Sequence, residues 1–425
     1  PVTCMPRFAT LPEWLAWQET LHPDKIDLGL ERVSAVTARL GLQDMQAAVV
    51  SVAGTNGKGS SVAMLESILL QAGYRTGCYT SPHLLRYNER IRINGTAIDD
   101  ASLCEAFAAV DTARDDTSLT YFEFGTLAAL WLFRRLSPDA VLLEVGLGGR
   151  LDAVNAMDAD VALVTAVDID HSRWLGNDRE RIGREKAGIF RSGRPAVCSD
   201  PVAPRSLRTV ADELGAHWYG LGEQFHIETQ AAGWQWRGPD SRHTDLPLPS
   251  LPGRHQLNNA AGTLMVLDCL RDRLPVPPPA IRSGLAGITL AGRCQVIPGP
   301  VELVLDVSHN PHGATALAGT LADRRCPGRT HVVLGMLQDK DACGTVAALQ
   351  PVADLWYLAS PDASQGLPAE QLLACVRQQS ADVPAQCFTD VAGAMQQAFA
   401  DANAGDRVVA CGSFYTVADA MACRV

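Results

Sequence analysis

The sequence lacks long hydrophobic runs, and it lacks a surplus of basic residues. No apolar stretch approaches the roughly 20 residues that cross a bilayer. The first residues do not show a basic start followed by an apolar core, so we expect no signal peptide. The net charge of −11 argues against a nucleic-acid-binding surface. We therefore exclude the membrane, secreted and nucleic-acid-binding classes.

Closely paired cysteines are also missing. The twelve cysteines are scattered, with no C-x-x-C pair and no zinc-like spacing. In a chain of this length they predict reduced, mostly buried thiols in a cytoplasmic protein. Apolar residues make up 47% and charged residues 20% of the 425 residues, which predicts a globular protein with two or three domains.

Short β-branched runs alternate with helical patterns in the first half of the chain. Continuous apolar runs such as "AVLLEV" are typical of strands buried on both faces. Their alternation with helices predicts a doubly wound, mostly parallel α/β domain. The predicted strands cover residues 47–52, 76–80, 140–145, 161–167 and 195–198. The predicted helices cover residues 60–71, 101–113, 123–136, 179–190 and 204–214.

The second half begins with a change of character. Residues 219–252 predict a small antiparallel hairpin and a proline-rich linker, and helices follow over 258–271 and 279–286. A second alternating set predicts a smaller Rossmann-like α/β domain that has no G-x-G-x-x-G fingerprint. Its predicted strands cover 301–307, 331–334, 355–358, 385–388 and 407–410. We expect a nucleotide-binding domain over 1–287, a connector over 288–296 and a second domain over 297–425.

The stretch "SVAGTNGKGSS" (residues 51–61) places three glycines, a lysine and two serines between a predicted strand and a predicted helix. A glycine-rich turn lets backbone N–H groups converge on an anion, and the helix N-terminus adds a positive dipole end. Lys58 adds a mobile charge, and a nearby hydroxyl can bind Mg²⁺. Val52 and Gly59 break the generic pattern, so a plain turn is the alternative. The order of the elements nevertheless favours a P-loop type phosphate site.

Further polar groups follow other predicted strands, where open α/β sheets bind their ligands. Glu144 ends an apolar strand, so its carboxylate needs either an ion-pair partner or a cation such as Mg²⁺. Asp152 and Asn155 follow on a glycine-rich turn and can hydrogen-bond a polar ring. Another such loop is either a substrate-binding loop or a solvated connection, and it contains Ser81, Pro82, His83, Arg86, Arg90 and Arg92.

Three more groups carry candidate chemistry. Asp168, Asp170 and His171 cluster after a strand and predict a ligand or catalytic contact. Lys186 lies on a mostly apolar helix face, where it either extends its amine to water or is buried and open to carbamylation by CO₂. The stretch "DVSHNPHG" (306–313) lacks the helical spacing of a metal pair. It therefore predicts hydrogen bonding to a nucleotide or substrate by Asp306, His309, Asn310 and His312.

Nine motifs in this order resemble those of the folylpolyglutamate synthase/dihydrofolate synthase branch of the Mur ligase superfamily. The resemblance extends from about residue 28 to residue 417. The motifs are "GTNGKGS", "TSPHL", "YFEFGTLAALWLF", "EVGLGGRLDAVN", "DHSRWLG", "IGREKAGIF", "AGRCQV", "DVSHNPHG" and "CGSFYTVAD".

The resemblance implies a two-domain, ATP-dependent ligase that forms amide bonds. Members of the family convert a carboxylate of a pterin compound into an acyl phosphate. The amine of L-glutamate then displaces the phosphate, and ADP and phosphate leave. The implied small-molecule partners are ATP, L-glutamate, dihydropteroate and reduced folates. The family also implies two Mg²⁺ ions, an optional monovalent cation and a monomer.

The resemblance assigns roles to individual positions. The ATP site would comprise Gly54, Thr55, Asn56, Gly57, Lys58, Gly59, Ser60, Asn259, Arg293 and Asp306. The pterin pocket would comprise Asp27, Leu28, Gly29, Pro82, His83, Thr120, Tyr121, Phe122, Glu123, Leu151, Asp152 and Ala153. The metal ligands would be Ser60, Ser81, Glu144, His171 and carbamylated Lys186. The catalytic groups would be Lys58, Lys186, His171 and His309, and His309 and His312 would lie where the second domain closes over the reaction centre.

Three alternatives stay open. A cell-wall Mur ligase is disfavoured because the pair "TSPHL" and "YFEFGT" fits a pterin pocket, and because we expect no additional N-terminal UDP-binding domain. A non-catalytic nucleotide switch would need fewer metal ligands than Glu144, His171 and Lys186 supply. Within the family, an enzyme with only one activity is the remaining alternative. The "TYFEF" loop resembles the bifunctional type, which acts on both dihydropteroate and tetrahydrofolates.

Overall fold

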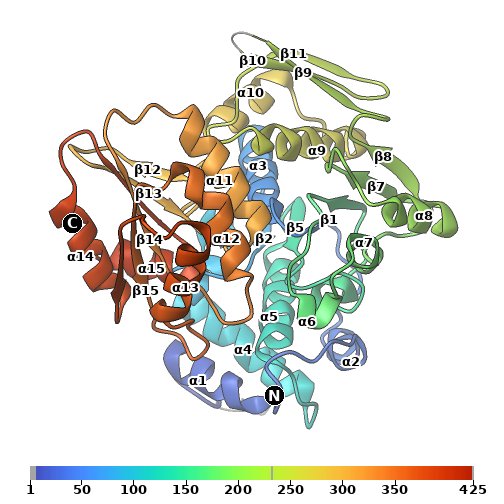
Figure 1. Cartoon of the computed structure of the whole chain (residues 1–425). Helices are drawn as coiled ribbons and strands as arrows, with labels where there is room; N and C mark the ends of the chain where they lie inside the picture. Colours follow the sequence, from blue (N-terminus) through green and yellow to red (C-terminus); the bar gives the residue numbers. More distant parts are fainter. Residues whose placement is uncertain (1–5, 231–232, 424–425) are drawn as a thin grey trace. The chain divides into compact units, whose positions relative to one another are not determined.

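A computed structural model describes residues 6–230 and 233–423 (Figure 1). The chain divides into two compact units. Unit 1 comprises Pro1–Val167, Asp178–Leu248 and Asn258–Ile288. Unit 2 comprises Asp168–Asn177, Pro249–Leu257 and Thr289–Val425.

The main sheet of unit 1 has eight strands in the order β4-β3-β2-β5-β1-β6-β7-β8. The six strands from β2 to β8 in this order are parallel, and β3 and β4 form an antiparallel edge. Every residue of β1 and β5 is buried, which is why their sequences are apolar apart from Ser51 and Glu144. The strands are β1 (Ala48–Ala53), β2 (Thr76–Tyr79), β3 (Ile91–Ile93), β4 (Thr96–Ala97), β5 (Ala140–Glu144), β6 (Val161–Val164), β7 (Pro195–Cys198) and β8 (His217–Gly220).

Helices complete the doubly wound layers of unit 1. The start of α5 shows how the sequence fixes a helix end: the Thr120 hydroxyl accepts from the Glu123 N–H, and the Glu123 carboxylate accepts from the Thr120 N–H. This capping box satisfies two N–H groups that the helix itself leaves unpaired. The helices are α1 (Leu11–Leu21), α2 (Glu31–Arg39), α3 (Lys58–Gln71), α4 (Asp100–Arg114), α5 (Tyr121–Leu136), α7 (Arg179–Ala187), α8 (Arg205–Leu214), α9 (His255–Cys269) and α10 (Pro278–Ala286).

A second, antiparallel sheet of unit 1 has the order β11-β10-β9 (Figure 1). Its strands are β9 (His226–Gln230), β10 (Gly233–Arg237) and β11 (Arg242–Leu246). The indole N–H of Trp236 donates to the Ala261 carbonyl of α9 at 3.1 Å, so the buried indole fixes this sheet to the helix. The sequence predicts a hairpin here, whereas the structure has three strands. Residues 231–232 of that prediction lie outside the described residues.

Unit 2 contains a six-stranded sheet in the order β12-β13-β17-β14-β15-β16, parallel except for β12. Its strands are β12 (Gln295–Ile297), β13 (Glu302–Asp306), β14 (Thr330–Leu334), β15 (Leu355–Ala359), β16 (Ala385–Phe388) and β17 (Arg407–Cys411). Its helices are α6 (Ser172–Leu175), α11 (Pro311–Asp323), α12 (Ala342–Leu349), α13 (Ala369–Gln379), α14 (Val391–Asp401) and α15 (Phe414–Ala422). The predicted fold class, a doubly wound P-loop type domain with a smaller Rossmann-like α/β domain, is confirmed.

One expectation about cysteine is wrong. Cys343 of α12 and Cys375 of α13 form a disulfide, with Cα atoms 4.8 Å apart. Both helices pack against each other in the core of unit 2, which brings together two cysteines 32 residues apart in the chain. The other nine cysteines within residues 6–230 and 233–423 are free, and only Cys387 is exposed.

Helices long and apolar enough to cross a membrane are absent from the described part of the chain.

Candidate phosphate, substrate and metal sites

The candidate phosphate loop follows β1, at the point where the order of the parallel strands reverses. From β1 the chain runs first to β2 and β5 on one side and then to β6 on the other. Open α/β sheets bind ligands at such a point, outside the carboxyl ends of the strands. Gly57 caps α3 with a φ of 95°, a left-handed conformation that glycine adopts without strain. The helix therefore begins at Lys58, two residues before the predicted start, and its N-terminal end lies at the loop.

Lys58 curls back over its own loop. Its Nζ donates to the carbonyls of Gly54 and Thr55, at 3.0 and 3.2 Å. The Thr55 N–H donates to the Ala166 carbonyl at 2.7 Å, which ties the loop to the end of β6. Asn259 of α9 lies against the same loop, because a Cβ on Gly57 would come within 2.5 Å of the Asn259 side-chain oxygen. Residues predicted for the ATP site therefore meet here from two distant segments of unit 1.

The candidate metal ligands of unit 1 include one carboxylate and one buried amine. Glu144, at the end of β5, is 4% exposed, and its Oε2 accepts from the Ser81 N–H at 3.2 Å. Lys186 of α7 is 3% exposed, which is the buried one of the two alternatives for this lysine, and Ser60 is also buried. No group of three or more His, Cys, Asp or Glu side chains forms a metal cage among the described residues. Mg²⁺ needs no such cage, since it binds through one or two carboxylates, phosphate oxygens and water.

The predicted pterin residues fall into three groups in unit 1. In the first, Arg32 of α2 joins Asp27 and Glu123: its guanidinium lies 2.5 Å from the Asp27 carboxylate and 3.1 Å from the Glu123 carboxylate. Glu123 also caps α5 together with Thr120. Leu28 and Gly29 lie in the turn between α1 and α2, next to Asp27. The sequence analysis missed Arg32, which orders this cluster.

The second cluster surrounds Arg90. Its Nε donates to His83 Nδ1 at 2.9 Å, and its guanidinium lies over the rings of Tyr87 and Tyr121. Burial, followed by the positive charge of Arg90, lowers the pKa of His83 to about 4. His83 is therefore neutral at pH 7, as its acceptor role requires. It follows the Ser81–Pro82 peptide bond, which is cis.

The two other arginines of this loop are paired within unit 1. Arg86 contacts Asp100 at 3.0 Å, and Arg92 contacts Glu66 at 2.9 Å. These two arginines hold the loop in place. Of the three arginines, Arg90 therefore fits the alternative of a substrate-binding loop best.

Asp152 is a buried carboxyl with an altered pKa. Burial raises its pKa to about 6, although the N–H groups of Leu147 and Val154 donate to it at 2.8 and 3.0 Å and the charge of Lys58 opposes the shift. Phe122 lies beside it, since a Cβ on Gly146 would touch both side chains. Leu151 and Ala153 flank it in the chain. Around pH 6 both the protonated and the ionised form of this carboxyl are present, so it can donate or accept hydrogen bonds, which suits a heteroaromatic ring.

The side chain of Asn155, unlike that of Asp152, is already bonded to other parts of the fold. Its amide nitrogen donates to the carbonyls of Arg150 and Gly188, and its side-chain oxygen accepts from Arg191 at 2.9 Å. These contacts give Asn155 a role within the fold rather than towards a ring.

In unit 2, Asp306 organises the end of β13. Its carboxylate accepts from the Cys294 N–H at 2.7 Å, from the Ser308 N–H at 2.8 Å and from the Ser308 hydroxyl. Next to Cys294, the Arg293 guanidinium lies over the Phe414 ring, 5.5 Å from its centroid. His255 lies near this group; burial lowers its pKa, and the charge of Asp306 acts in the opposite direction. Arg293 and Asp306 therefore belong to one ordered region.

His309 is held at both ring nitrogens. Nδ1 lies 2.8 Å from the Val307 carbonyl, and Nε2 lies 3.2 Å from the Asp170 carboxylate. These two contacts fix the orientation of the ring. Asp170 also accepts from Lys340 Nζ at 2.7 Å, and Lys340 was missed by the sequence analysis. Burial raises the pKa of Asp170, but the hydrogen bond from His309 and the charges of Lys340 and His171 hold it well below its usual range.

The three predicted residues of segment 168–177 make different contacts. Asp168 accepts from the Ile169 N–H at 2.7 Å, and Asp170 pairs with His309 and Lys340. His171 has a φ of 51°, a left-handed conformation that is uncommon for residues other than glycine, and it precedes the single turn of α6. His312 lies two residues beyond Asn310, whose side chain caps α11 by accepting from the Gly313 N–H.

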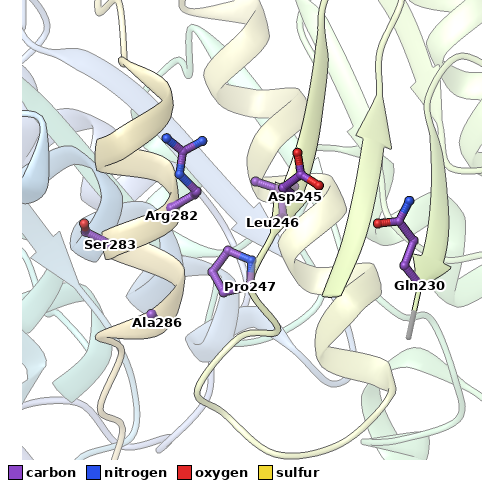
Figure 2. Close-up of a pocket in the computed structure, with 7 residues that line it drawn as sticks. All are labelled: Gln230, Asp245, Leu246, Pro247, Arg282, Ser283 and Ala286. Atoms are coloured by element: carbon purple, nitrogen blue, oxygen red, sulfur yellow. The ribbon is translucent and has the colours of Figure 1, made fainter. Parts of the chain in front are cut away.

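A cavity of about 480 Å³ lies elsewhere in unit 1, between the antiparallel sheet and α10 (Figure 2). Helix α10 contributes one wall of the cavity, and the antiparallel sheet with the residue that follows β11 contributes the other, as Figure 2 shows. None of its lining residues was predicted as a site residue. They are Gln230, Asp245, Leu246, Pro247, Arg282, Ser283 and Ala286.

Comparison with known proteins first identifies the class. Residues 292–414 match the family model described as Mur ligase, glutamate ligase domain. Together with a P-loop type domain and a Rossmann-like domain, this match defines an ATP-dependent, amide-forming ligase of the Mur type.

The particular family follows from whole-chain relatives. The chain is 47% identical over 411 residues to the dihydrofolate synthase/folylpolyglutamate synthase of Escherichia coli (strain K12), covering 97% of this chain and 94% of that protein. A structure of E. coli FolC in complex with DHPP and ADP has a TM-score of 0.92 at 46% identity, covering 97% of both chains. A bifunctional folylpolyglutamate synthase/dihydrofolate synthase with Mn, AMPPNP and L-glutamate bound has a TM-score of 0.90 at 47% identity, covering 97% of this chain and 98% of that one. The chain belongs to the dihydrofolate synthase/folylpolyglutamate synthase family.

Proposed function

We propose that the protein is a bifunctional, ATP-dependent ligase that adds L-glutamate to dihydropteroate and to tetrahydrofolates. The acid is first phosphorylated by ATP, the glutamate amine then attacks the acyl phosphate, and ADP and phosphate are released. The observation that carries this proposal is the glycine-rich loop at the switch point of unit 1, in a chain that is 47% identical to a dihydrofolate synthase/folylpolyglutamate synthase over nearly its whole length.

The phosphate loop would bind the ATP phosphates. Gly54, Thr55, Asn56, Gly57, Gly59 and Ser60 would bring backbone N–H groups and the N-terminus of α3 to the phosphate oxygens. The Lys58 amine, which lies on its own loop carbonyls at 3.0 and 3.2 Å, would turn to the phosphates and stabilise the charge that develops during phosphoryl transfer. Asn259, Arg293 and Asp306 would contact the nucleotide.

Two Mg²⁺ ions, bound by the side chains of Ser60, Ser81, Glu144, His171 and carbamylated Lys186, would neutralise the phosphate and carboxylate charges and so lower their repulsion. The residues of unit 1 fit this role, because Glu144 and Lys186 are both buried and Glu144 contacts the backbone of Ser81. His309 would be a catalytic group beside the reacting carboxyl, in an orientation fixed by Asp170 and the Val307 carbonyl. We propose that the enzyme also binds a monovalent cation as a cofactor.

The pterin compound would bind to three groups of residues in unit 1. Asp152 and Phe122 offer a buried carboxyl and an aromatic face in contact with the same glycine, Gly146. The Arg90 cluster adds Pro82, His83 and Tyr121. The Arg32 cluster adds Asp27, Leu28, Gly29, Thr120 and Glu123, and Leu151 and Ala153 flank Asp152.

The partners are then small molecules, with no nucleic acid or membrane, and the protein acts as a cytoplasmic monomer. A reducing cytoplasm keeps cysteine pairs as thiols, so Cys343 and Cys375 would be reduced there and would pair on oxidation.

Phosphate release is the direct test. The protein is mixed with ATP, Mg²⁺, L-glutamate and either dihydropteroate or tetrahydrofolate, and each component is omitted in turn. We expect phosphate release with both acids and none without glutamate. Release with only one acid reduces the proposal to a single activity. Release only with a UDP-sugar peptide supports a cell-wall ligase, and release that needs no acid supports a nucleotide switch.

A further inference from the structure

Asp170 is a buried, heavily bonded carboxylate in segment 168–177 of unit 2. Its Oδ1 accepts from Lys340 Nζ and from the His171 N–H, both at 2.7 Å. Its Oδ2 accepts from Asn310 Nδ2 at 2.9 Å and lies 3.2 Å from His309 Nε2. Two donors at each oxygen account for the lone pairs of an ionised carboxylate. The donors come from three separate segments, which the carboxylate holds together.

The pair between Asp170 and Lys340 is buried. The two side chains are 8% and 7% exposed. Removal of one partner from such a pair leaves the other charge buried without compensation, whereas removal of both is often tolerated. Asp339 is the other carboxylate near Lys340, but it is 44% exposed and its oxygen is 4.0 Å from Nζ. Lys340 is therefore committed to Asp170.

Asp170 contacts two histidines, His171 and His309, which both have roles in the proposed function. The backbone of His171 is left-handed, and a residue other than glycine keeps that conformation only where its surroundings determine it. The hydrogen bond from its N–H to Asp170 is one such determinant. The ring of His309 is oriented by Asp170 at one nitrogen and by the Val307 carbonyl at the other. The backbone position of His171 and the ring orientation of His309 thus both depend on where the Asp170 carboxylate lies.

We propose that Asp170 and Lys340 are a positioning pair, in which the buried Lys340 amine fixes the Asp170 carboxylate and the carboxylate orients His171 and His309. The inference rests on the proposed function, which assigns His171 to metal binding and His309 to catalysis. Neither Asp170 nor Lys340 needs to touch a substrate. Their contribution is to keep the two imidazoles in one arrangement through many turnovers.

A double-mutant cycle of Lys340→Met and Asp170→Asn tests the pair. Residues that orient metal ligands typically change metal affinity or activity by about 10- to 100-fold when they are replaced. We expect each single variant to lose about that much in kcat, with KM for ATP within about threefold of the wild type, because the phosphate loop is untouched. We expect the double variant to be no worse than the poorer single variant. Multiplied losses in the double variant would overturn the proposal.

A second readout does not depend on turnover. Mn²⁺ binding is measured by electron paramagnetic resonance in the presence of a non-hydrolysable ATP analogue. We expect Lys340→Met to weaken Mn²⁺ binding and Lys340→Arg to restore most of it. Wild-type Mn²⁺ affinity and kcat in Lys340→Met would overturn the proposal.

The matched control is Arg254→Met. Arg254 forms an ion pair with Asp323 in the same unit at 3.0 Å, but the two side chains are 87% and 53% exposed. We expect this variant to behave as wild type. The double variant guards against misfolding, because it leaves no uncompensated buried charge. If the wild type releases no phosphate with either acid but Lys340→Met still weakens Mn²⁺ binding, the proposed function fails and the positioning pair stands.

Discussion

At the scale of single residues, Lys58 is the side chain whose role in phosphoryl transfer can be tested first. It is the cation of a loop whose other members contribute mainly backbone groups. We expect Lys58→Met to lower kcat by about 100- to 1,000-fold, since its charge stabilises the transferring phosphoryl group. The measurement is the initial rate of phosphate release. Arg208→Met on the surface helix α8, where Arg208 is 47% exposed, is the control and should retain full activity. Unchanged kcat in Lys58→Met would remove the loop from the mechanism.

Asp152 gives a pH-dependent prediction. Its pKa is about 6 in the folded protein, against an ordinary value of 3.8. The unfolded chain therefore loses this proton at a lower pH than the folded protein, and wild-type stability falls as pH rises from about 4 through about 6. Asp152→Asn removes that dependence.

We expect the free energy of unfolding of Asp152→Asn, relative to wild type, to rise by up to about 3 kcal/mol between pH 4 and pH 7. Urea denaturation at a series of pH values measures it. A difference that stays constant across that range would contradict the assignment of a raised pKa.

Arg32 and Lys340 are site residues that could not be predicted from the sequence. Arg32 contacts a carboxylate 91 positions away, and Lys340 contacts one 170 positions away. Neither lies in a recognisable pattern, because their significance comes from partners that only the tertiary fold supplies. Glu144 and Asp152 were predictable, since Glu144 ends a buried strand and Asp152 lies on the glycine-rich turn that follows it.

At the scale of helices and strands, the contact between α3 and α10 is unusually close. A Cβ on Gly284 of α10 would lie 2.6 Å from the Cα of Ile68 in α3. We expect Gly284→Ala to lower the free energy of unfolding by about 1–3 kcal/mol, because backbone atoms cannot move aside easily. Urea denaturation measures the change.

Gly319 of α11 is the matched comparison. A Cβ there meets no atom within 4 Å. We expect Gly319→Ala to raise the free energy of unfolding by up to about 1 kcal/mol, since alanine favours a helix more than glycine does. Equal effects of the two substitutions would show that the helix contact does not matter.

The disulfide between α12 and α13 predicts a redox effect on stability. It closes a loop between positions 32 residues apart. We expect reduction of the oxidised protein to lower the free energy of unfolding by about 3 kcal/mol, mainly because the unfolded chain gains freedom. Urea denaturation with and without a reductant measures it. A Cys343→Ala/Cys375→Ala variant should not respond to reductant, and a response of equal size in that variant would contradict the assignment.

Strand positions were predictable to within a few residues wherever burial on both faces produced continuous apolar runs, as in β1, β5 and β7. Short edge strands were not. The pairs β3–β4 and the strand β12 contain only two or three residues each, so their hydrogen bonds leave little trace in the sequence. The third strand of the antiparallel sheet was missed for a different reason, because polar residues dominate Arg242–Leu246.

For the whole molecule, the sequence predicted two α/β folds because strand–helix alternation determines layered architecture. It could not predict that segments 168–177 and 249–257 group with unit 2, since this grouping depends on contacts such as those of Asp170 and Arg254. The proposed division into residues 1–287, 288–296 and 297–425 stays a prediction.

The central claim is that one protein glutamylates two different folate acids. Mass spectrometry of the products, after incubation with ATP, Mg²⁺ and L-glutamate, tests it most directly. We predict that dihydropteroate gains one glutamyl residue and that tetrahydrofolate gains one or more. The absence of a glutamyl product from either acid, in a preparation that still hydrolyses ATP, would contradict the bifunctional account.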